Sequence, residues 1–61
     1  MNNLEIFDKA VCVFDRYRND RYCGHIIGRF FDGFGTAWFT VEVSPEDVRV
    51  AMPTWIESIE E

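Results

Sequence analysis

The chain has 61 residues, a formal net charge of −5, 48% hydrophobic and 28% charged residues. This length allows one small domain, residues 1–61, and this composition favours a folded globule over a disordered segment. Apolar runs are shorter than the ~20 residues of a membrane helix and the N-terminus is acidic, so we expect no membrane span, no secretory signal and a cytoplasmic location.

Two strands are expected in the first half of the chain. In residues 9–15 two valines alternate with other side chains, which is the pattern of a half-buried strand. The pair Asn19-Asp20 is a turn signal. Residues 22–31 form the second expected strand, and the two glycines within it mark bends or close approaches of backbone.

The clearest strand pattern covers residues 36–43, directly after the glycine-containing turn at residues 32–35. Its side chains alternate with period 2, and threonine, valine and aromatic residues suit a pleated, half-buried surface. Trp38 falls on the face opposite the predicted core. A large aromatic ring on that face of a small domain is a candidate binding residue.

The last third of the chain predicts a fourth strand at residues 47–52. Residues 53–55 (Pro-Thr-Trp) then form one short 3-10 turn, and residues 56–59 form a last edge strand. Short strands joined by glycine bends suit a small closed sheet, because closure removes exposed edges. These segments fit a mostly β fold, a small five-stranded barrel.

A different architecture also fits part of the pattern. Apolar residues recur at helical spacing over residues 4–18, with charged residues opposite them. Ser44-Pro45 resembles the N-cap and first turn of a second helix. This alternative is an α+β fold, in which two helices flank a two-stranded hairpin.

Several segments resemble SH3-like and KOW-type small barrels. Residues 7–13 and 22–28 are similar to the way such barrels open, with an acid, a base, alternating valines, a turn and a Gly-x-Ile strand. Residues 48–50, followed by Trp55-Ile56 and Ile59, are similar to the way they close. The resemblance implies a five-stranded barrel and, because KOW-like barrels include nucleic-acid and ribosome binders, a binding role.

Cys12 and Cys23 are expected as free thiols, because nothing else in the chain indicates an oxidising compartment. With His25 they offer three metal ligands, but a structural zinc site needs four, usually in two close pairs, so we expect no metal and no cofactor. Cys23 and His25 also suit a nucleophile and its base. A domain this small has little room for a water-excluding cleft, so we expect no enzyme activity.

One candidate function is nucleic-acid binding by a KOW-like module through the arginine- and tyrosine-containing segment 16–31. Guanidinium groups bind phosphates and aromatic rings stack on bases. The pI of about 4.6 is opposite to the basic footprint expected of such proteins. The residues of this hypothesis are Arg16, Arg18, Arg21 and Arg29.

The preferred hypothesis is a small acidic protein that binds a larger protein. Arginine, tyrosine and tryptophan are common at interface hot spots. An acidic C-terminal third favours a basic partner surface, such as a nucleic-acid-binding groove, which the protein would occupy as a phage- or plasmid-type inhibitor. A second copy that closes a sheet edge is a further expectation. The predicted binding residues are Tyr17, Arg18, Tyr22, Trp38, Glu57, Glu60 and Glu61.

Overall fold

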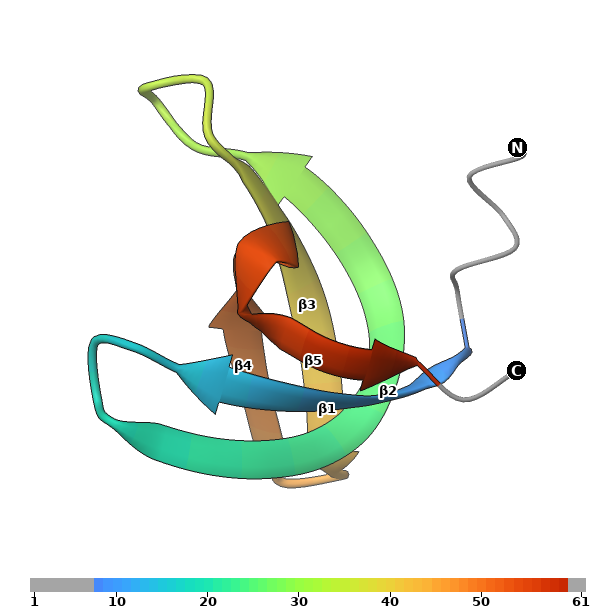
Figure 1. Cartoon of the computed structure of the whole chain (residues 1–61). Helices are drawn as coiled ribbons and strands as arrows, with labels where there is room; N and C mark the ends of the chain where they lie inside the picture. Colours follow the sequence, from blue (N-terminus) through green and yellow to red (C-terminus); the bar gives the residue numbers. More distant parts are fainter. Residues whose placement is uncertain (1–7, 60–61) are drawn as a thin grey trace.

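The computed structural model describes residues 8–59 as five antiparallel strands in one sheet, with one 3-10 turn before the last strand (Figure 1). The elements are β1 (Ala10–Asp15), β2 (Asp20–Phe31), β3 (Ala37–Ser44), β4 (Asp47–Ala51), the turn η2 (Pro53–Trp55) and β5 (Ile56–Ile59).

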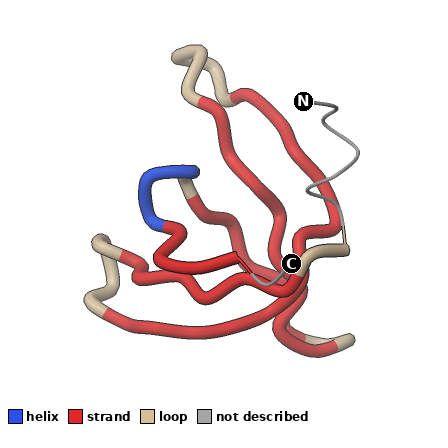
Figure 2. Tube along the Cα trace, turned by 45° about the vertical axis from the view of Figure 1, so that its right-hand side comes forward, coloured by secondary structure: helices blue, strands red, loops and turns tan. Residues whose placement is uncertain are grey.

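The strand order across the sheet is β4-β3-β2-β1-β5. The 12-residue β2 is shared by two parts of the sheet, since its first half pairs with β1 and its second half with β3. Figures 1 and 2 show β2 as one long, strongly curved strand. Ile27 is an extra residue in its pairing with β3, and such bulges bend a strand. The curvature folds the sheet around its apolar face.

The core lies on the concave side of this sheet. Alternation along β1 directs Val11 and Val13 inward, while β2 and β3 contribute Ile26 and Val41, all four almost fully buried. Burial of each such aliphatic side chain stabilises the folded state by about 1.5–3 kcal/mol. The complete buried apolar set is Val11, Val13, Tyr22, Ile26, Phe39, Val41, Ala51 and Trp55.

The structure confirms the prediction of a mostly β fold with a 3-10 turn at Pro53. The α+β alternative is wrong over the described residues. Residues 10–15 form a strand that pairs on both sides, and Ser44-Pro45 leads through a tight turn into β4 instead of starting a helix. Residues 4–7 of the alternative N-terminal helix lie outside the described residues.

The sheet has two free edges. Within residues 8–59, β4 pairs only with β3 and β5 pairs only with β1, so no strand pairing joins β4 to β5. The five predicted strands are therefore present in one curved but unclosed sheet.

Candidate functional site

Three aromatic rings lie in a row across one end of the sheet. Tyr17 comes from the β1–β2 turn, Trp55 from η2 and Trp38 from β3. The ring of Trp55 meets Tyr17 at a centroid distance of 5.0 Å and Trp38 at 5.5 Å, both edge to face. We call these three residues the aromatic row. Trp55 is its buried centre, Trp38 is half-buried, and Tyr17 is 77% exposed.

The β1–β2 turn holds Tyr17 in place through an aspartate. The buried Asp15 carboxylate accepts hydrogen bonds from the backbone N–H groups of Tyr17, at 2.9 Å, and of Arg18, at 3.0 Å. Asn19 completes the turn with a φ of 53°, a left-handed conformation that asparagine adopts more readily than most residues. An exposed tyrosine is thus carried by an ordered turn.

The loop between β2 and β3 is ordered by a second aspartate. The Oδ1 atom of Asp32 accepts hydrogen bonds from the backbone N–H groups of Phe34, at 2.8 Å, and of Thr36, at 2.9 Å. Its Oδ2 atom accepts one from the indole Nε1 of Trp38, at 2.9 Å. The Trp38 bond, followed by the backbone bond from Thr36, lowers the pKa of Asp32 below its ordinary value. The loop is therefore tied to the aromatic row through one carboxylate.

Phe34 lies at the tip of this loop and is 96% exposed. Phe31, at the end of β2, is also exposed. The sequence predicts only a turn at residues 32–35, so Phe34 is not among the predicted binding residues. A phenylalanine between two glycines in a hairpin turn has no neighbouring side chain to cover it. The Gly-Phe-Gly sequence is therefore the feature that could have indicated an exposed Phe34. Together the aromatic row and Phe34 form what we call the aromatic surface.

The other predicted binding residues lie in different environments. Arg18 is exposed beside Tyr17, as a binding residue must be. Tyr22 is 9% exposed in the core, so the structure does not present it on the surface. Glu57 is exposed and forms an ion pair with Arg21 at 3.2 Å. Glu60 and Glu61 lie outside the described residues.

The four arginines of the nucleic-acid hypothesis do not share one environment. Arg16 and Arg18 are exposed in the β1–β2 turn, whereas Arg29 lies near the opposite end of β2. Arg21 is partly neutralised by Glu57, and its guanidinium lies 4.7 Å from the centroid of the Phe14 ring. The turn thus supplies two basic side chains beside Tyr17 that form no ion pair with any residue from 8 to 59. The four arginines as a set are dispersed over the structure.

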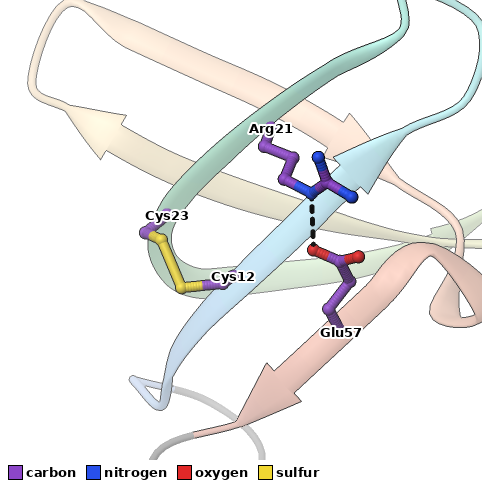
Figure 3. The surroundings of a disulfide bond; sticks show 4 residues. All are labelled: Cys12, Arg21, Cys23 and Glu57. Atoms are coloured by element: carbon purple, nitrogen blue, oxygen red, sulfur yellow. Dashed lines mark hydrogen bonds and ion pairs between the residues drawn. A yellow bond between two sulfur atoms is a disulfide. The ribbon is translucent and has the colours of Figure 1, made fainter.

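The two cysteines are joined by a disulfide, so the expectation of free thiols is wrong. Cys12 and Cys23 are direct partners in the β1–β2 register, with their Cα atoms 4.1 Å apart (Figure 3). In this form the Cys23 sulfur is not a thiolate nucleophile for His25 to activate. Disulfides persist mainly in oxidising compartments, so the cysteines no longer argue for a reducing cytoplasm.

Two surface hollows lined by described residues are open to solvent. The larger of these two, about 480 Å³, is lined by Phe39, Pro53 and the four residues of β5. Among the residues that the structure describes, no three metal-binding side chains gather at one point. No helix in residues 8–59 is long and apolar enough to cross a membrane.

The chain matches no family model, no curated protein and no solved structure. The fold and the aromatic surface define it as a small, mostly β protein in which two exposed aromatic side chains, Tyr17 and Phe34, are carried by ordered turns.

Proposed function

We propose that the protein binds a larger protein through the aromatic surface and has no catalytic role. The observation that carries this proposal is the Asp32 carboxylate, which hydrogen-bonds both the loop that exposes Phe34 and the indole of Trp38. A surface that is ordered before binding loses little conformational entropy on association. Exposed aromatic residues on such a surface are the usual anchors of protein interfaces.

The partner surface should offer an apolar pocket for Phe34 and basic residues around it. The chain carries a net charge of −5, which steers basic partners toward it and repels nucleic acid and anionic membranes. An acidic protein that occupies a basic, nucleic-acid-binding groove would inhibit its partner in the manner of small phage and plasmid proteins.

The SH3-like barrel is also kept as a proposal. The strand order β4-β3-β2-β1-β5, the curvature of β2 and the 3-10 turn before β5 support it. Nucleic-acid binding is the second candidate function, supported by the exposed Arg16 and Arg18 on either side of Tyr17.

Affinity capture from a lysate, with and without nuclease, tests the proposal. The baits are the unchanged protein, Phe34→Ala, Tyr17→Ala and Ile59→Ala, the last being a control that removes an exposed apolar side chain from β5. We expect a partner whose capture persists after nuclease treatment. Phe34→Ala or Tyr17→Ala should weaken its binding, by about 2 kcal/mol if the residue is a hot spot. The Ile59→Ala bait should bind normally.

Equal binding by all four baits would exclude the aromatic surface. Capture that vanishes with nuclease and depends on Arg16 and Arg18 would favour the nucleic-acid function. The acidic contribution is tested by Glu60→Lys with Glu61→Lys, which should weaken binding and flatten its salt dependence. Reversing Glu57 would also break its ion pair with Arg21, so that variant is less informative.

A further inference from the structure

The edge strand β4 (Asp47–Ala51) presents unpaired backbone. Its pairing partner is β3 alone, and nothing in residues 8–59 pairs with its other side. In an antiparallel strand, alternate residues direct their N–H and C=O groups to that free side. Such an edge is a template for another strand.

The side chains of β4 leave this edge open. Val48 and Val50 are 51% and 44% exposed on one face of the strand. Natural edges are usually protected by lysine, proline, an inward-pointing charge or a bulge within the strand. The strand β4 contains neither lysine nor proline, and the extra residue in its pairing, Val43, belongs to β3.

Arg49, the central residue of β4, is directed away from the free edge. Its guanidinium lies 4.8 Å from the centroid of the Tyr22 ring on β2 and forms ion pairs with Asp47 at 3.1 Å and Asp20 at 3.3 Å. A charge held in this way over the sheet's own core does not obstruct a strand arriving at the edge.

We propose that β4 pairs with β4 of a second copy, antiparallel about a two-fold axis at Arg49. In this register Val48 lies opposite Val50 of the second copy, and the reverse pair is identical, so four exposed valines meet on one face. On the other face Arg49 lies directly opposite Arg49 of the second copy, and like charges in that position are unfavourable. Each Arg49 is already ion-paired with Asp47 and Asp20 of its own copy, and Asp47 of the second copy is its diagonal neighbour, so the repulsion is reduced. The valine face of the strand is thus complementary to itself.

The charge of β4 does not oppose a second copy at this edge. Asp47 and Arg49 leave β4 without net charge, although the whole chain carries −5. The repulsion between two copies therefore comes from the rest of the chain, and added salt should strengthen their association by screening it. A five-residue edge is much smaller than a standard interface of about 800 Å² per partner, so the dimer should form at high micromolar to millimolar concentration.

Sedimentation velocity at increasing protein concentration tests this proposal. We expect the mass to rise from 7.2 kDa toward twice that value, more so at higher salt. Val50→Lys should abolish the rise, because the lysine stands on the edge opposite Val48 of the second copy. Ile27→Lys is the matched control, since Ile27 is 47% exposed on β2 and this change alters net charge equally. It should still dimerise.

Amide hydrogen exchange of the unchanged protein is a second measurement that does not depend on a variant folding. Alternate amides of β4 should become protected only as concentration rises, while amides of the β5 edge should not. A mass of 7.2 kDa at every concentration, or equal behaviour of Val50→Lys and Ile27→Lys, would overturn the proposal. Protection confined to β5 would overturn it too.

Discussion

The indole Nε1 of Trp38 donates a hydrogen bond of 2.9 Å to the carboxylate of Asp32, six residues earlier in the chain. The same carboxylate accepts two backbone N–H groups of its own loop. Protonation of one side chain would therefore weaken three contacts at once and release the loop from the aromatic row. We therefore expect pH to act on the candidate binding surface through Asp32.

Acid should weaken the fold through Asp32. The pKa of this residue is lowered from 3.8 in the folded protein, first by the Trp38 bond and then by the Thr36 backbone. A carboxylate with a lowered folded pKa adds stability above its unfolded pKa and loses it as pH falls through the folded value. Asp32→Asn should therefore lower the urea midpoint at neutral pH, and its difference from the unchanged protein should vanish in acid.

The measurement is a series of urea unfolding curves from neutral pH to below 3.8, with Glu46→Gln as a control. Glu46 is an exposed acid in the β3–β4 turn. The Trp38 indole proton should also shift during the acid titration, as seen by NMR. A midpoint difference that persists unchanged into acid would contradict this role of Asp32.

The strands could be predicted because alternation is a local property. The pattern of residues 36–43 corresponds to β3 within one residue at each end, and Pro53 marked η2 correctly. The register between strands depends on distant residues. The sequence indicated a turn at Asn19-Asp20 but not that β2 begins at Asp20, and it is this register that places Cys12 opposite Cys23.

The candidate site was partly predictable for the same reason. Tyr17 and Trp38 stood out by residue type. The predicted position of Trp38, on the face opposite the core, is wrong, because its half-buried ring packs against the core. Its contact with Trp55, the common neighbour of the two residues, depends on how η2 packs over the sheet. Tyr22 was predicted as a binding residue because tyrosine is common at interface hot spots. Alternation along β2 places it in the core, where Arg49 covers its ring.

Gly24 should not tolerate a side chain. A Cβ atom there would overlap the backbone carbonyl oxygen of Glu42 and lie 2.9 Å from Cγ1 of Val41. Backbone cannot move away as a flexible side chain can, so Gly24→Ala should lower the free energy of unfolding by about 1–3 kcal/mol. Chemical denaturation measures the loss.

Gly28 supplies the matched control on the same strand. A Cβ atom there would lie 3.6 Å from Thr40, which is ordinary van der Waals contact. Gly28→Ala should leave stability unchanged or raise it by up to about 1 kcal/mol, because alanine has less freedom to lose on folding. Equal effects of the two substitutions would contradict the close approach of β2 and β3 at Gly24.

The Cys12–Cys23 disulfide should stabilise the β1–β2 hairpin. It closes a loop with a sequence separation of 11. The chain-entropy model gives about 2–3 kcal/mol for a loop of this size. Reduction of the disulfide in the unchanged protein should lower the free energy of unfolding by this amount. The double variant Cys12→Ala/Cys23→Ala should be equally destabilised.

The double variant also controls for other effects of the reductant, because the unfolding curve of this variant should be the same with and without reductant. Cys23 is exposed, so mild reductants should reach the bond without unfolding the protein. Two reactive thiols in the native protein under oxidising conditions would contradict the pairing that the structure shows.

The hydroxyl of Tyr22 should be dispensable for stability. It is buried, and no hydrogen-bond partner for it exists within the described residues. Burial, followed by the charge of Asp15, raises the pKa of Tyr22 above 10.0. A buried polar group without a partner costs free energy, so Tyr22→Phe should leave the free energy of unfolding unchanged or raise it by about 1 kcal/mol. The ring beneath Arg49 is retained.

Alkaline pH should separate this variant from the unchanged protein. The pKa of Tyr22 is raised in the folded protein. The contribution of Tyr22 to the free energy of unfolding is therefore complete below pH 10.0 and is lost as the pH rises through the folded pKa. Tyr22→Phe lacks this loss and should become relatively more stable with rising pH, as measured by urea unfolding. Tyr17→Phe, at an exposed position, should show no such gain. A Tyr22→Phe variant that is clearly less stable would indicate that the hydroxyl has a partner after all.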